Sequence, residues 1–247
     1  MTCFEPRVSG GIALLFAAGV AQACIVPVFR YGLERWSPDA HVMTVTSNAA
    51  PGEVFTADPG HANLWVERAR GAQDVPVKVS FPRSDIAWYE GEWDDGLPAR
   101  LADSPLRRRI AHELLTGTTA AFVMLESSNR ATNEAVHAML VERLDALVQE
   151  IELEEEPDYE DEAADWSGPG SGGDLSRIPL RVEFPLHKLA RENAAEQFLI
   201  QQFEAVNPLL KDAAEVAIGV VFGRGRMILL AGNEVTPDII DEICWFL

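Results

Sequence analysis

The sequence predicts an α/β protein with mixed sheets flanked by helices, and three features of its second half carry this prediction. Residues 118–126 are nearly continuously apolar, which is typical of a strand buried on both faces. An amphipathic helix is predicted over 131–151, with apolar residues at helical spacing. The apolar runs 216–222 and 226–231 are joined by Gly223-Arg224-Gly225, a hairpin signal. A strand–helix alternation followed by a hairpin favours a mixed sheet.

The first half of the chain contains shorter elements. We expect a helix over 27–36 and then, in order, strands over 42–46, 63–69, 75–81 and 86–89. A helix then starts at Pro105, with Ser104 as its N-cap, and ends at Gly117. Because Arg107, Arg108 and Arg109 are consecutive, they cannot share one helix face, and we expect them to balance surface charge.

Three further elements are predicted in the second half. A strand is expected over 178–184 and an amphipathic helix over 192–206. The last helix has Thr236 as N-cap and Pro237 at its first position. Its apolar residues are expected to face the core, and packing is also the expected role of the aromatic pair Trp245-Phe246. Those expected to face the core are Ile239, Ile240, Ile243 and Phe246.

An acidic and then glycine-rich stretch interrupts this pattern. Residues 150–165 are dominated by Glu and Asp, and residues 167–173 read SGPGSGG. Such composition predicts a disordered surface insertion over 152–174. A cation-binding segment is the alternative interpretation, although the EF-hand spacing D-x-[DN]-x-[DN]-G is absent.

The N-terminus has the three parts of a signal peptide. Arg7 provides a positive charge, residues 11–20 are apolar, and Ala21-Gln22-Ala23 fits a cleavage site between small residues. We therefore expect a signal peptide over 1–23, a mature chain that begins at Cys24, and location in the periplasm or cell envelope. A lipoprotein signal that attaches lipid to Cys24 is the alternative. No other stretch is long and apolar enough to span a membrane.

Composition and motifs exclude several classes of function. A net charge of -19 opposes binding to nucleic acid, because such binding needs Lys and Arg to neutralise phosphates. The charge is compatible with cations or with a basic partner. The sequence contains no Walker A, GxGxxG, GxSxG or HExxH motif, and none of its His residues has metal-ligand spacing with another His or Cys. We therefore expect no cofactor and no metal.

The predicted order over 118–247 resembles the thioredoxin fold: strand, helix, strand, helix, hairpin, helix. Residues 42–117 repeat this order in a degenerate form, so the resemblance implies tandem thioredoxin-like units over 24–117 and 118–247. Redox-active members carry CxxC at the start of the first helix, where this chain has Ser127-Ser128-Asn129-Arg130 and, in the first unit, residues 47–50 (SNAA). The fold resemblance therefore does not imply thiol–disulfide exchange.

A second resemblance spans most of the chain. Residues 23–36 (ACIVPVFRYGLERW) are similar to the mature start of a group of uncharacterised exported bacterial proteins. Later blocks also look similar to that group, namely Ser104-Pro105 with Arg107 to Arg109, residues 124–130 and residues 222–226. This resemblance implies export and a shared fold, but no activity.

Two cysteines and three residues of the hairpin define the candidate sites. Cys24 precedes a predicted helix and is a candidate for a reactive or lipidated thiol, or for a disulfide with Cys244. Arg224 and Arg226 flank Gly225 on the hairpin and form a candidate anion site, with a solvated turn as the alternative. No catalytic residue is predicted.

The expected function follows from this absence of a dithiol. We expect a non-catalytic binding or scaffold module of the cell envelope, with an envelope protein as the expected partner. The alternatives are a single-thiol redox protein that uses Cys24 and an acidic protein that binds cations through residues 152–165.

Overall fold

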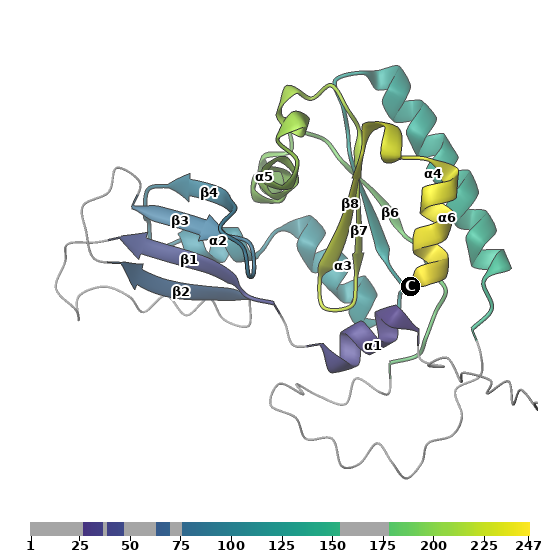
Figure 1. Ribbon diagram of the computed structural model, residues 1–247, viewed down its shortest axis with the longest axis horizontal. Helices are drawn as coiled ribbons and strands as arrows, with labels where there is room; N and C mark the ends of the chain where they lie inside the picture. The colour runs from purple at the N-terminus through teal and green to yellow at the C-terminus, as the bar shows by residue number, and fades with distance from the viewer. Residues whose placement is uncertain (1–26, 37–38, 47–62, 70–75, 154–177) are drawn as a thin grey trace, which may run out of the picture.

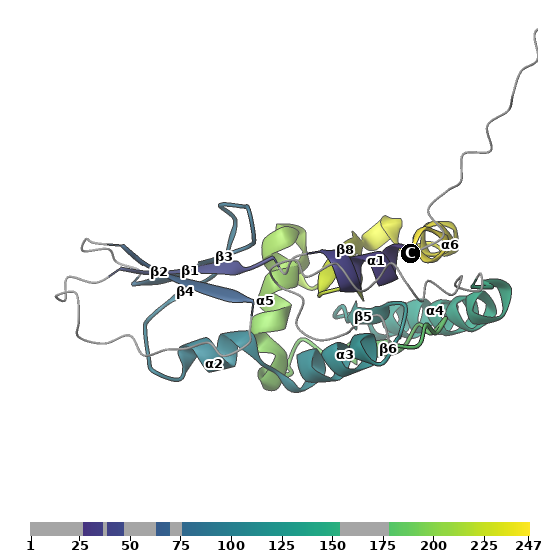
Figure 2. The same cartoon turned by 90° about the horizontal axis from the view of Figure 1, so that it is seen from below.

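A computed structural model describes residues 27–36, 39–46, 63–69, 76–153 and 178–247. These residues form two four-stranded mixed sheets with helices packed around them. In Figure 1 the first sheet lies at the left and the second at the right, and helix α5 lies between them in Figures 1 and 2. The predicted α/β class, with mixed sheets flanked by helices, is confirmed.

The first sheet has the strand order β2-β1-β3-β4. β1 is parallel to β2 and antiparallel to β3, and β3 is antiparallel to β4. All four strands were predicted to within two residues at each end. Their bounds are β1 (His41–Thr46), β2 (Leu64–Ala69), β3 (Val77–Ser80) and β4 (Ala87–Gly91).

Two helices follow the first sheet. α2 (Leu97–Ala102) was not predicted, and its buried Leu97 and Leu101 join the core of the first sheet. α3 (Pro105–Leu115) begins as predicted, because the backbone N–H of Arg107 donates to Ser104 Oγ at 3.3 Å. α2 therefore packs on the first sheet, whereas Ile110 and Leu114 of α3 pack on the second.

The second sheet repeats the strand order and directions of the first. Its order is β6-β5-β7-β8, with β5 parallel to β6, β5 antiparallel to β7 and β7 antiparallel to β8. Its strands are β5 (Ala121–Leu125), β6 (Leu186–Leu189), β7 (Ala217–Phe222) and β8 (Arg226–Ala231), and its helices are α4 (Arg130–Glu150), α5 (Gln197–Val206) and α6 (Pro237–Phe246). Short 3₁₀ helices η3 (Ala194–Glu196), η4 (Pro208–Asp212) and η5 (Gly232–Glu234) lie between them.

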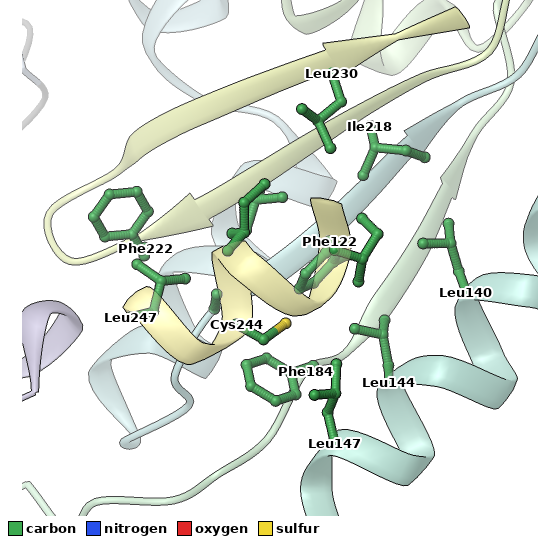
Figure 3. Close-up of a cluster of buried hydrophobic side chains, with 14 of the residues drawn as sticks. Phe122, Leu140, Leu144, Leu147, Phe184, Ile218, Phe222, Leu230, Cys244 and Leu247 are labelled. Carbon is green, nitrogen blue, oxygen red and sulfur yellow. The ribbon is translucent and has the colours of Figure 1, made fainter. Parts of the chain in front are cut away.

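Helices cover both faces of the second sheet. Every residue of β5 is buried, and alternate residues point to opposite faces, as the apolar run 118–126 predicts. Phe122 and Met124 pack against α4 and α6, whereas Val123 and Leu125 pack against α3 and α5. Figure 3 shows the α4–α6 side of this core, with Leu140, Leu144 and Leu147 of α4 directed toward the sheet.

The prediction of a strand over 178–184 is wrong. Only Arg181 in that range forms a β-bridge, with Thr118, and the ladder strand β6 begins at Leu186. The apolar alternation of Leu180, Val182 and Phe184 reflects packing on the core instead. Regular pairing resumes after Pro185, whose carbonyl oxygen accepts a hydrogen bond from the Phe122 backbone N–H at 2.8 Å.

Helix α1 (Val28–Arg35) packs against the second sheet, although it precedes the first sheet in sequence (Figure 1). Phe29 is buried in the core beside α6, and its backbone N–H donates to the carbonyl oxygen of Leu247 at 3.1 Å. The second half of the fold is therefore completed by residues from the start of the described chain.

Helix α5 contributes to both cores. Leu199, Ile200 and Phe203 pack on the second sheet. Phe198 and Ala205 pack against the core of the first sheet, where Phe198 meets Tyr89 edge-to-face at 5.5 Å. The two sheets therefore share one helix.

Arg107 departs from its predicted surface role. Its guanidinium donates to the carbonyl oxygen of Leu101 and, at 3.0 Å, to Gln202 Oε1 of α5. Burial lowers its pKa from the ordinary arginine value. Arg107 therefore ties α2 and α3 to α5, while Arg108 and Arg109 are exposed as expected.

Several predictions concern residues outside the described ranges. They are the signal peptide over 1–23, Cys24, the degenerate segment 47–50 and all of the insertion over 152–174 except Glu152 and Leu153. Within the described ranges, no helix combines the length and the apolar character needed to cross a membrane.

Candidate functional site

The loop between β5 and α4 occupies the place where the predicted fold would carry a dithiol. Asn129 caps α4, because its Oδ1 accepts hydrogen bonds from the backbone N–H groups of Ala131 (3.0 Å) and Thr132 (3.3 Å). Asn133 closes the loop from the first turn of the helix: its Nδ2 donates to the Ser127 carbonyl oxygen at 2.8 Å, and its Oδ1 accepts from the Ser127 backbone N–H at 2.9 Å. The side chains of Asn129 and Asn133 therefore hold this loop against the start of the helix.

An arginine occupies the same edge of the second sheet. Arg191 follows β6, and its guanidinium donates to the Glu126 carbonyl oxygen (2.7 Å) and to Glu204 of α5 (3.1 Å). The backbone N–H of Ser128 donates to Ala213 at 2.7 Å, which joins the loop to the chain that leads into β7. Carboxyl ends of strands are common ligand sites in α/β sheets, but here the polar groups are paired with one another.

Cys244 is buried on α6. Only 3% of its surface is exposed, and Figure 3 shows its side chain beside Phe184. Burial raises the pKa of the Cys244 thiol to about 12, and the nearby Asp241 carboxylate adds to this shift. The thiol therefore stays protonated at neutral pH, so it is a poor nucleophile in the folded protein.

The two hairpin arginines hold the N-terminal segment. Arg224 Nε donates to the carbonyl oxygen of Leu33 in α1 at 2.7 Å. Arg226 lies over the ring of Trp36 with its guanidinium carbon 4.0 Å from the ring centre, and it pairs with Asp39 at 3.0 Å. Gly225 has a φ of 85°, which suits the tight turn between the strands. The residues predicted as an anion site thus contact groups of the protein itself.

A shallow apolar hollow of about 280 Å³ lies where α1, α4 and α6 meet. Its wall includes the first described residue, Pro27, together with Val28 and Phe29 of α1. Thr119 and Glu152 add polar groups to the wall. The other lining residues are apolar: Ile151, Leu153, Val182, Phe184, Cys244, Trp245, Phe246 and Leu247. Cys244 and Pro27 therefore line the same hollow.

Trp245 and Phe246 were predicted to pack, and this prediction is wrong. Trp245 is 58% exposed and Phe246 is 60% exposed, and both line the hollow. Leu247 is buried instead, together with Ile240 and Ile243. The signal in the sequence was available, because the apolar residues of 237–247 span more than one face of a helix.

The structure keeps the candidate residues in separate places. Arg224 and Arg226 lie at the hairpin, and Cys244 lies in the core beside the hollow. In the described part of the chain, no group of three His, Cys, Asp or Glu side chains is arranged to hold a metal ion.

No protein-family model, no curated protein and no solved structure matches the chain.

Proposed function

We propose that this protein is an exported, non-catalytic binding module of the bacterial cell envelope, built from two thioredoxin-like units without a dithiol. Its partner in this proposal is a protein of the envelope. The high negative charge of the chain favours a partner with a basic surface.

The tandem architecture is supported by the common topology of the two sheets. In each sheet the first strand pairs parallel with the second and antiparallel with the third, and the fourth strand forms the far edge beside the third. In the second unit α4 and α6 share one face and α5 covers the other. This arrangement of strands and helices supports the proposed thioredoxin resemblance of the second unit.

The observation that carries the non-catalytic role is the loop between β5 and α4. Where a redox-active unit has its attacking thiol, this chain has Ser127, and Asn133 ties that residue to the helix through hydrogen bonds. The described thiol, Cys244, is buried elsewhere and protonated at neutral pH. A scaffold with these features favours binding over thiol exchange.

Export is supported by sequence features that lie outside the described residues. The charged start, apolar run and small-residue site over 1–23 are typical of a cleaved signal. The similarity of residues 23–36 to the mature start of uncharacterised exported proteins agrees with this proposal.

A paired assay tests the proposal. The mature protein is assayed for reduction of a protein disulfide by dithiothreitol, beside a variant in which Cys24 and Cys244 are both Ser. In parallel, envelope preparations are cross-linked and the products are identified by mass spectrometry. We expect equal, background rates for both proteins and one reproducible protein partner. Turnover that depends on either cysteine, with no specific cross-linked partner, would contradict the proposal.

A further inference from the structure

The apolar hollow presents two aromatic side chains that do not pack in the core. Trp245 and Phe246 both line it and remain largely exposed, although the next residue, Leu247, is buried. Large aromatic side chains are enriched among the residues that contribute most of the binding energy at protein interfaces. Exposed aromatic surface beside an apolar depression is typical of an interaction site.

The wall of the hollow is held in place by the core. Phe29, Phe184 and Cys244 line it, and all three are buried. The Phe29 backbone N–H donates to the Leu247 carbonyl oxygen at 3.1 Å, which holds α1 against the end of α6. The volume of about 280 Å³ lies just below the roughly 300–1,000 Å³ of small-molecule pockets. The hollow therefore suits one large side chain of a protein partner.

Carboxylates lie around the hollow. Glu152 lines it, and Glu242 lies one helical turn before the two aromatic residues on α6. Both glutamates are exposed. Beside them, Arg143 pairs with two carboxylates at once, those of Glu150 and Asp241. This group of five side chains therefore carries more negative than positive charge.

The nearby basic groups do not offset this charge. In the described chain, the basic residues within two positions of a lining residue are Arg30 and Arg181. Arg30 pairs with Glu34, and Arg181 pairs with Glu183 at 3.7 Å. The surroundings of the hollow are therefore complementary to a partner that carries Lys or Arg.

We propose that the hollow binds an apolar side chain of a basic protein segment, with Lys or Arg of that segment beside Glu152 and Glu242. The apolar side chain is aromatic or a large aliphatic one, and its burial against the apolar wall provides affinity. The basic groups also interact with the exposed rings of Trp245 and Phe246. The net charge of -19 disfavours a second copy of the chain as occupant. This inference rests on the proposed function, because it names the site for the basic envelope partner.

Fluorescence anisotropy with a synthetic peptide tests the chemistry of the site. The probe is a labelled peptide with one Phe between two pairs of Lys, and matched peptides replace Phe by Ala or each Lys by Glu. We expect the protein to bind the probe and to bind either matched peptide at least about tenfold more weakly. Equal affinities for the Phe and Ala peptides would overturn the proposal, and so would a probe that does not bind.

Variants of the hollow test where the peptide binds. Trp245→Ala and Phe246→Ala remove exposed rings, and Trp65→Ala is the matched control, because Trp65 is 62% exposed on β2. We expect either hollow variant to weaken binding by about tenfold and the control to leave it unchanged. Glu152→Gln should weaken binding mainly at low salt, since screening reduces the attraction between exposed charges. Equal losses in Trp65→Ala and Trp245→Ala would place the peptide elsewhere.

Two further measurements separate the other outcomes. A dimer seen in sedimentation equilibrium that dissociates in Trp245→Ala would make a second copy the occupant and overturn the inference. An envelope partner that still cross-links when Trp245 and Phe246 are both Ala would leave the proposed function intact and overturn only the site. If no envelope partner cross-links to the unchanged protein, the proposed function fails, and the peptide measurement still decides the chemistry of the hollow.

Discussion

The Glu196 carboxylate accepts a hydrogen bond of 2.5 Å from Ser104 Oγ, across 92 residues of sequence. Its other oxygen accepts from the backbone N–H of Leu106 at 2.7 Å, in the first turn of α3. Glu196 is 2% exposed, so the negative charge lies buried at the positive end of the α3 dipole. This contact joins the helix that follows the first sheet to the segment that starts α5.

Removal of the Glu196 charge should destabilise the fold. Hydrogen bonds to a charged group contribute about 1.5–3 kcal/mol each, so we expect Glu196→Gln to lower the free energy of unfolding by about that amount. Urea denaturation followed by circular dichroism gives the value. Glu192→Gln is the matched control, because Glu192 is exposed and lies in the same segment. Equal stability of the two variants would contradict the role of Glu196.

The hairpin tip offers a second test, because two of its glycines differ in their surroundings. Both have positive φ, 57° at Gly223 and 85° at Gly225. A Cβ on Gly223 would lie 3.2 Å from the carbonyl carbon of Gly32 in α1, whereas a Cβ on Gly225 would meet no atom within 4 Å. Gly223→Ala should therefore push α1 away from the hairpin, and Gly225→Ala should not.

Hydrogen exchange reads out this displacement. We expect the backbone N–H groups of 29–33 to exchange at least tenfold faster in Gly223→Ala than in Gly225→Ala, because the first substitution loosens α1 locally. Both variants should also lose about 1 kcal/mol through the strain of an alanine at positive φ. If α1 is equally protected in both variants, the contact between Gly223 and Gly32 does not hold the helix.

His41 should make the stability depend on pH. Trp88 Nε1 donates to His41 Nδ1 at 3.0 Å, so the ring is neutral in the fold. Burial lowers the pKa of His41 to about 4, the positive charge of Arg107 adds to the shift, and a hydrogen bond with the Ser80 backbone opposes it. The unfolded chain has the ordinary histidine pKa of 6.5, so between pH 6.5 and 4 it binds a proton that the folded protein does not.

This contribution is therefore fully present above pH 6.5 and is lost as the pH falls toward 4. The loss is about 1.4 kcal/mol per pH unit, in addition to the effects of carboxylates. His41→Gln retains a side-chain acceptor for Trp88 but cannot titrate. We expect the free energy of unfolding of this variant to fall less steeply with pH over this range. The difference in slope should correspond to nearly one bound proton. Parallel pH profiles for the two proteins would show that His41 does not titrate in this way.

Sequence reasoning was accurate where one local signal decides the structure. Ser104 and Pro105 start α3, Thr236 and Pro237 start α6, and Gly223 to Gly225 turn the hairpin, all as predicted. Each of these signals acts within a few residues, so tertiary packing does not override it.

Long-range contacts account for the errors. Leu180 and Val182 alternate like a strand, yet they pack on the core without a ladder, and β6 begins after Pro185. Arg107 has the sequence context of a surface residue, but its partners Leu101 and Gln202 come from other helices. The hollow beside Cys244 could not be predicted either, because the residues that line it come from several parts of the chain that are far apart in sequence.

Because helix α5 packs in the cores of both sheets, we expect the two sheets to unfold together. Phe198 faces the first sheet and Phe203, which is fully buried, faces the second, so loss of either core exposes one side of the same helix. We expect Phe198→Ala to destabilise both sheets by about 3–5 kcal/mol or somewhat less, because Phe198 is only partly buried. Val206→Ala, on the exposed end of α5, should cost under 1 kcal/mol.

Hydrogen exchange with mass spectrometry in increasing urea would follow peptides from β1 and β5 separately. Coincident transitions that shift together in Phe198→Ala are expected, since the shared helix couples the cores. A first sheet that opens alone while β5 stays protected would mean that α5 binds the second core independently.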